Sequence, residues 1–127
     1  MKNALIDIMS FPKKTATAIP VGSPVILNQS NTDYVTTTTT ANDKAVYGVT
    51  MGDSVIEGEV MVMRLGVGPV RVAVVAGVAV GDFLTSHTIA GTAVEATAGQ
   101  ESFAKVDIAP LANTALATCF INCCHRG

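Results

Sequence analysis

The chain has 127 residues, of which 49% are hydrophobic and only 14% are charged, and its formal net charge is −2. This length fits one domain or two small modules, and so few charges predict that partners or other copies of the chain cover much of the surface. With no basic cluster beyond Lys13 and Lys14 and no Trp, the composition excludes a typical nucleic-acid binder.

The longest apolar stretch, residues 67–80, is interrupted by Pro69 and Arg71 and is shorter than the roughly 20 residues of a spanning helix. Asp7 likewise interrupts the apolar N-terminus, which therefore does not resemble a signal peptide. We expect a soluble protein with no membrane partner. The three cysteines all lie within residues 119–124, a pattern that predicts no disulfide framework and fits synthesis in a reducing compartment.

Residues 1–14 are predicted to form an N-terminal arm. The apolar run within this arm is expected to end at Pro12. The arm is either an edge strand of the same domain or an extension that packs on a neighbouring subunit. Its candidate contact residues are the apolar side chains, namely Leu5, Ile6, Ile8, Met9 and Phe11.

Short runs rich in β-branched and apolar residues then predict strands, separated by Gly, Pro, Asn and Asp. The expected strands are residues 25–27, 34–40, 45–51, 59–65, 70–76, 83–85, 92–97, 102–109 and 114–123. Residues 66–69 read as a turn between two of them. Residues 111–120 would also fit a short helix by their Ala and Leu content, but their Thr residues favour a strand. This spacing predicts an all-β fold, a small β-sandwich or barrel.

A short phrase occurs twice, as Val21-Gly22-Ser23-Pro24-Val25 and as Val80-Gly81-Asp82-Phe83-Leu84. The two glycines lie 59 residues apart, and Val49 and Val106, at a later matching position, lie 57 apart. A nearly constant offset predicts two similar β modules, about 15–70 and 71–127, that share one core. Gly22 and Gly81 are then structural turn residues, and Asp82 or Ser23 bonds local amides.

One cluster could carry metal chemistry, and it consists of Cys119, Cys123, Cys124 and His125. In an extended strand Cys119 and Cys123 point to one face and Cys124 to the other, which disfavours the convergent ligands of a zinc site. Buried thiols that act as small apolar groups are the favoured interpretation, and an intersubunit disulfide is the alternative.

Asp82, Ser86 and His87 suggest a catalytic triad, but their order and tight spacing do not match the known arrangements. The acidic residues Asp53, Glu57 and Glu59 lack the alternating oxygen ligands of a calcium loop. We therefore predict no catalytic residues, no cofactor and no enzymatic activity.

The segment Gly77-Val78-Ala79-Val80-Gly81-Asp82-Phe83-Leu84, followed by an Ala- and Thr-rich strand and a final hydrophobic strand, resembles the capsid decoration (cement) proteins of tailed phages. These are short β domains with phrases of the type V-x-x-G-D-x-V/L. The resemblance covers the second half best, and the Cys- and His-containing C-terminus departs from the family pattern.

The resemblance implies a structural virion protein on the outside of a capsid, made in the host cytoplasm. Its partners would be the major capsid protein, whose subunits it bridges, and itself as a homotrimer. The arm residues would then contact capsid or neighbouring subunits, gaining affinity through multivalency. The alternative function is a receptor- or glycan-binding β module of a phage fibre or cell surface, which the low aromatic content of 5% disfavours.

Overall fold

A computed structural model describes residues 9–73 and 78–123 of the chain. Within these ranges the chain forms nine strands and no helix, so the predicted all-β fold is confirmed. The strands are β1 (Met9–Thr15), β2 (Pro24–Leu27), β3 (Tyr34–Thr37), β4 (Gly48–Thr50), β5 (Gly58–Arg71), β6 (Phe83–Ser86), β7 (Ala93–Glu95), β8 (Ala104–Ile108) and β9 (Leu116–Asn122). The described residues include no helix that could span a membrane.

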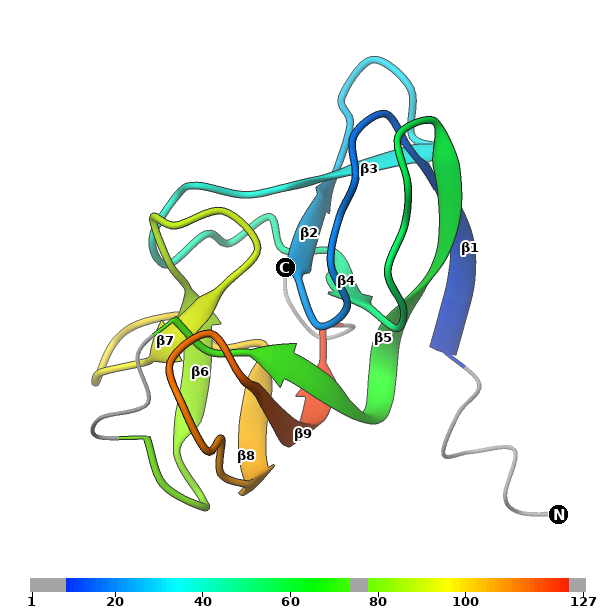
Figure 1. Ribbon diagram of the computed structural model, residues 1–127. Helices are drawn as coiled ribbons and strands as arrows, with labels where there is room; N and C mark the ends of the chain where they lie inside the picture. Colours follow the sequence, from blue (N-terminus) through cyan, green and yellow to red (C-terminus); the bar gives the residue numbers. More distant parts are fainter. Residues whose placement is uncertain (1–8, 74–77, 124–127) are drawn as a thin grey trace, which may run out of the picture.

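The first module is a closed barrel of five strands in the order β1-β3-β2-β4-β5 (Figure 1). β1 pairs in parallel with β3 and antiparallel with the first half of β5, and the second pairing closes the barrel. Small β-branched residues fill its interior, because alternate positions of each strand face inward. The buried cluster comprises Ile19, Val25, Val35, Val60 and Val62.

The second module repeats this arrangement, with the second half of β5 in the place of β1. β9 pairs with β5, β8 with β9, and β6 with both β8 and β7, all antiparallel. A parallel bridge between Val72 and Ala93 corresponds to the parallel pairing of β1 with β3. The strand order and pairings of residues 58–122 therefore resemble those of residues 9–71.

Backbone hydrogen bonds correct the predicted alignment of the two modules by one residue. The amide of Gly22 donates to the carbonyl of Thr50 at 2.9 Å, and the amide of Gly81 donates to the carbonyl of Val106 at 2.8 Å. Val106 therefore corresponds to Thr50, not to Val49. The shared residue type suggested that Val49 matches Val106, but backbone pairing determines which residues correspond. The hydroxyl of Thr50 also accepts a hydrogen bond from the amide of Ser23 at 3.0 Å.

Residues 66–69, which were predicted to form a turn, instead lie within β5. This single strand of 14 residues serves both modules. Gly66 has a φ of 142°, a conformation that L side chains rarely adopt. At Gly68 a Cβ atom would meet the side chains of Met51 at 2.9 Å and Ile121 at 3.3 Å. The glycines therefore allow an irregular backbone and close packing inside one strand, where the sequence suggested a chain reversal.

The N-terminal region also differs from the prediction where it is described. Pro12 does not end the segment but lies within β1, opposite Met61 of β5. It is tolerated because β3 reaches only Lys14 and Thr15, which leaves β1 as an edge at Pro12. The predicted arm boundary at residue 14 thus falls inside a strand of the first module, while residues 1–8 lie outside the described part of the chain.

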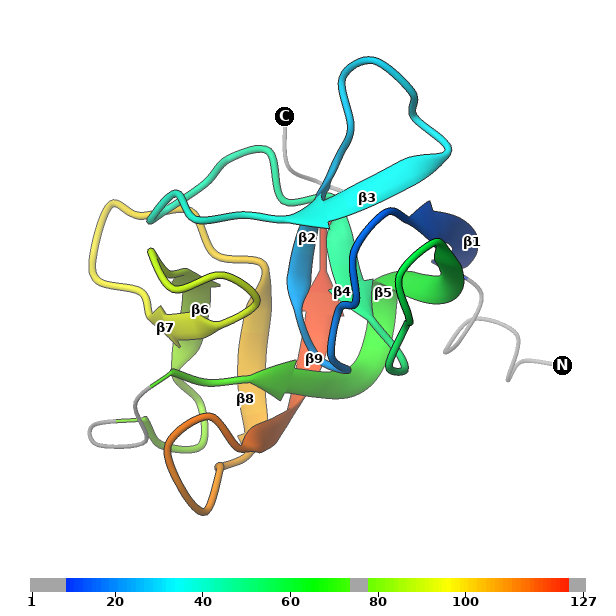
Figure 2. The same cartoon turned by 45° about the horizontal axis from the view of Figure 1, so that its top comes forward.

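The two modules are joined by more than β5. The buried cluster of the second module also takes in Val46, Val49 and Met63 of the first. The segment between β3 and β4 leaves the first barrel and crosses to β6, as Figures 1 and 2 show. There the amide of Asp43 donates to Ser86 Oγ at 2.7 Å, and Ser86 Oγ donates to the carbonyl of Thr40 at 2.7 Å. The run of threonines predicted as one strand therefore divides between β3, which ends at Thr37, and this crossing segment.

Candidate interaction surface

A row of four outward-facing residues crosses the sheet of the second module. Phe83 of β6 lies opposite Lys105 of β8, Lys105 lies opposite Phe120 of β9, and Phe120 lies opposite Val67 of β5. The row arises because side chains alternate between the two faces of a strand, so one register brings four of them together. We call this outer side of β6, β8, β9 and β5 the outer face.

Three of the four residues in this row are apolar although the outer face meets solvent. Phe83 is 52% exposed, Phe120 47% and Val67 50%. Val80, in the turn before β6, is 66% exposed and borders the same region. Scattered apolar residues are common on protein surfaces, but two exposed phenylalanines that line one hollow are typical of a contact surface.

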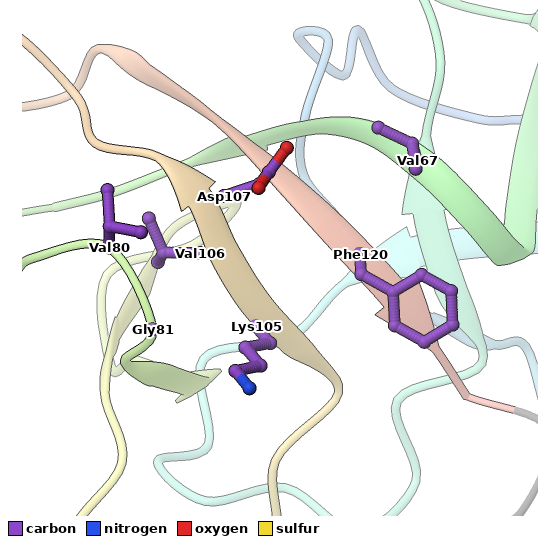
Figure 3. Close-up of a pocket in the computed structure, with 7 residues that line it drawn as sticks. All are labelled: Val67, Val80, Gly81, Lys105, Val106, Asp107 and Phe120. Carbon is purple, nitrogen blue, oxygen red and sulfur yellow. The ribbon is translucent and has the colours of Figure 1, made fainter.

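Two hollows lie on the outer face, on either side of Lys105 and Phe120. The first has a volume of about 480 Å³ and is lined by Val67, Val80, Gly81, Lys105, Val106, Asp107 and Phe120 (Figure 3). The second, of about 330 Å³, is lined by Phe83, Ser102, Phe103, Ala104, Lys105, Phe120 and Asn122. Lys105 and Phe120 line both hollows and thus form a ridge between them.

Two charges of opposite sign stand at the centre of this surface. Lys105 and Asp107 of β8 are both exposed and both line the first hollow, although the register of β8 against β9 shifts between Val106 and Ile108. Lys105 Nζ lies 5.5 Å from the centre of the Phe83 ring, within cation–π range. Within the described ranges, neither Lys105 nor Asp107 forms an ion pair with another residue of the chain.

Of the predicted turn residues, Gly81 lines the first hollow of the outer face. Gly22 occupies the equivalent turn of the first module. Gly22 and Gly81 have φ values of 82° and 94°, which glycine adopts without strain. Asp82 Oδ2 accepts a hydrogen bond from the amide of Ala79 at 2.8 Å, and Ser23 Oγ donates to the carbonyl of Pro20 at 2.7 Å. These side chains therefore bond the backbone of their own turns.

Cys119 and Cys123 are fully buried in the core of the second module as free thiols. Burial, with a smaller contribution from Asp107, raises the pKa of Cys119 to about 12. Cys124 and His125 lie outside the described residues. Among those described, no three His, Cys, Asp or Glu side chains gather in a way that could hold a metal ion.

The side chains of the suggested triad contact different parts of the chain. Ser86 Oγ bonds the crossing segment, as described above, and His87 Nδ1 accepts from the amide of Ile89 at 3.0 Å. Each hydrogen bond has a structural explanation in the turn or segment that contains it.

The predicted arm residues fall into two groups. Leu5, Ile6 and Ile8 lie outside the described part of the chain. Met9 begins β1 opposite Leu65, and Phe11 lies opposite Val62 with its side chain exposed.

Sequence reasoning missed the residues of the outer face. One signal for them is present in β9, where Phe120 is in phase with Thr118 and Asn122, on the side opposite to the buried Ala117, Cys119 and Ile121. A phenylalanine on the polar side of an alternating strand marks an exposed aromatic residue. Phe83 and Val67, which lie in the same row as Phe120, are far from it in the sequence. No local pattern could therefore have assigned the three residues to one surface.

No family model and no curated protein matches the sequence. Among solved structures, the chain is similar to the N base of the head fiber gp8.5 of bacteriophage phi29, with a TM-score of 0.67. The similarity covers 90% of this chain and 93% of that chain, at 20% sequence identity. At this identity the likeness establishes a shared fold, which spans both modules.

Proposed function

We propose that the chain is a structural protein of a phage virion, which decorates the outside of a capsid and stabilises it by bridging major capsid subunits. The observation that carries the proposal is the shared fold with the base of a phage head fibre over nearly the whole chain. The resemblance of the Val80–Leu84 phrase to cement proteins supports the same class.

A bridging protein needs contact areas for at least two subunits, and the two modules offer equivalent ones. The loop from β4 to β5 exposes Val55 and Ile56 by 70% and 69%, and the loop from β8 to β9 exposes Leu111 by 97%. Figure 1 shows these loops at opposite ends of the molecule, the first at the top and the second at the lower left. We propose that each loop contacts a different capsid subunit, together with the arm residues Leu5, Ile6, Ile8, Met9 and Phe11.

The test is to mix the purified protein with capsid shells that lack it and to measure co-sedimentation and the temperature at which the shells break. We expect binding and a higher breaking temperature. Ile56→Ser and Leu111→Ser should each weaken binding, and either one should remove most of the stabilisation, because a bridge needs both ends. Wild-type protein that does not bind shells contradicts the proposal, and binding to glycans or cells instead would favour the receptor-binding alternative.

We also propose that the protein self-associates as a homotrimer, which fits its low charge and the exposed apolar outer face. A native mass of three times the 13.1 kDa of one chain is expected. A mass of one chain at every concentration tested contradicts this part of the proposal.

A further inference from the structure

We propose that the outer face of β6, β8, β9 and β5 is buried against neighbouring copies of this chain in the proposed trimer, with Lys105 of each copy against Asp107 of the next. This inference rests on the proposed self-association and assigns the surface and the ion pair that produce it. Three properties of the outer face support it.

The first property is the apolar area that would be removed from water. Phe83, Phe120 and Val67 are each about half exposed in the isolated chain. The gain from burying an apolar side chain grows with the area removed from water, so half-exposed side chains retain part of that gain for association. Phenylalanine is also enriched in the cores of protein interfaces.

The second property is the charge pattern, which identifies the partner. Lys105 and Asp107 are exposed and line the same hollow, so two charges of opposite sign lie close together on the outer face. A partner surface of a single sign would pair with one of these charges and leave the other desolvated, which is costly. In a closed ring of copies, Lys105 of each copy faces Asp107 of the next, so both charges of every copy are paired.

The third property is shape. The ridge of Lys105 and Phe120 separates hollows of about 480 Å³ and 330 Å³ on the same face. A surface that carries both a ridge and hollows can fit a copy of itself, because the ridge of one copy enters a hollow of the other. Figure 3 shows Val67 and Phe120 around the first hollow, across β8 from Val80.

The experiment is a charge-reversal cycle on the full chain, followed by sedimentation over a wide range of concentrations. Lys105→Asp places two acids against each other, and Asp107→Lys places two bases against each other. We expect each single variant to raise the dissociation constant at least tenfold and the double variant Lys105→Asp/Asp107→Lys to restore it to within about threefold of wild type. Phe120→Ser should raise the dissociation constant both in the wild-type chain and in the double variant Lys105→Asp/Asp107→Lys.

Lys44→Glu is the matched control, because Lys44 is an exposed lysine of the first module. Its reversal should leave the dissociation constant unchanged, and circular dichroism should show the same β content for every variant. Single variants that lose association without rescue by the double variant overturn the ion pair. Association that none of the outer-face variants alters overturns the whole inference.

Shell binding separates this inference from the proposed function. A wild-type protein that associates through the outer face but does not bind shells leaves the inference standing and contradicts the proposed function. A wild-type protein that binds shells as a single chain supports shell binding and contradicts the inference. Outer-face variants that associate normally but no longer bind shells would show that the capsid covers this face, and would also overturn the inference.

Discussion

Gly22 and Gly81 occupy the same turn in the two modules, but their surroundings differ. A Cβ atom at Gly22 would lie 2.5 Å from Leu116 Cδ2 and 3.0 Å from the backbone nitrogen of Arg71. At Gly81 no atom outside its immediate neighbours lies within 4 Å of that position. The pair therefore separates the cost of the backbone conformation from the cost of crowding.

We predict that Gly81→Ala lowers the free energy of unfolding by about 1–2 kcal/mol, the cost of a left-handed conformation for an L residue. Gly22→Ala should cost about 1–3 kcal/mol more, because the added methyl group also overpacks the contact between the modules. Urea unfolding of both variants measures the difference. Equal losses would mean that the backbone near Arg71 yields without strain.

The buried thiol of Cys119 links stability to pH. Its folded pKa of about 12 lies above the ordinary value of 9.0, mainly because of burial and also because of Asp107. As pH rises above about 9, the unfolded chain releases this proton while the folded chain keeps it. The stability that depends on Cys119 is therefore fully present below pH 9 and is lost as pH rises toward 12.

We predict that wild-type stability falls relative to Cys119→Ala by up to about 1.4 kcal/mol per pH unit above pH 9. Denaturant unfolding at several pH values between 7 and 10.5 measures this, and the variant cancels the titration of Lys and Tyr residues that both proteins share. Parallel curves for the two proteins would contradict the raised pKa.

At the scale of elements, the segment between β3 and β4 attaches the first module to the second through Asn42. Asn42 has a φ of 55°, its amide donates to the carbonyl of Ser86 at 3.2 Å, and its Oδ1 accepts from the amide of Glu101 at 2.7 Å. Asn tolerates this left-handed conformation better than most residues. Both the backbone and the side chain therefore favour Asn at this position.

We predict that Asn42→Gly lowers the free energy of unfolding by about 1 kcal/mol, because the side-chain hydrogen bond is lost while the conformation remains easy. Asn42→Ala should cost about 1–2 kcal/mol more, because it adds the strain of the positive φ. Chemical denaturation of the three proteins gives the order. A variant Asn42→Ala as stable as Asn42→Gly would argue that the segment changes its conformation.

The strands themselves were largely predictable, since runs of Val, Thr and Ile favour extended backbone wherever they occur. Their ends were less so, because tertiary pairing decided that the threonine strand stops at Thr37 and that β5 continues through Pro69. A Gly-x-Gly-Pro sequence is typical of a turn, but here the segment pairs with β9, and Met51 and Ile121 lie close to Gly68. The outer face depends on register across four strands, which the sequence does not specify locally.

At the scale of the whole molecule, β5 makes the two modules dependent on each other. Its first half closes the first barrel through β1, and its second half pairs with β9 in the second module. Arg71, at its end, adds contacts to both: its backbone amide donates to the carbonyl of Gly22 at 2.8 Å, and its Nη1 donates to the carbonyl of Thr114 at 2.7 Å. Neither module contains a complete set of strands without this shared element.

We therefore predict a single unfolding transition for both modules, and the chain carries a separate probe in each. Both tyrosines, Tyr34 and Tyr47, lie in the first module and there is no Trp, so tyrosine fluorescence reports on that module alone. In a Cys123→Ala/Cys124→Ala background, the labelling of Cys119 reports on the second module. Gly68→Val should lower both midpoints together by an amount equivalent to about 1–3 kcal/mol, because the added side chain meets Met51 of the first module and Ile121 of the second. Two midpoints that separate, or a shift in only one of them, would show that β5 does not couple the modules.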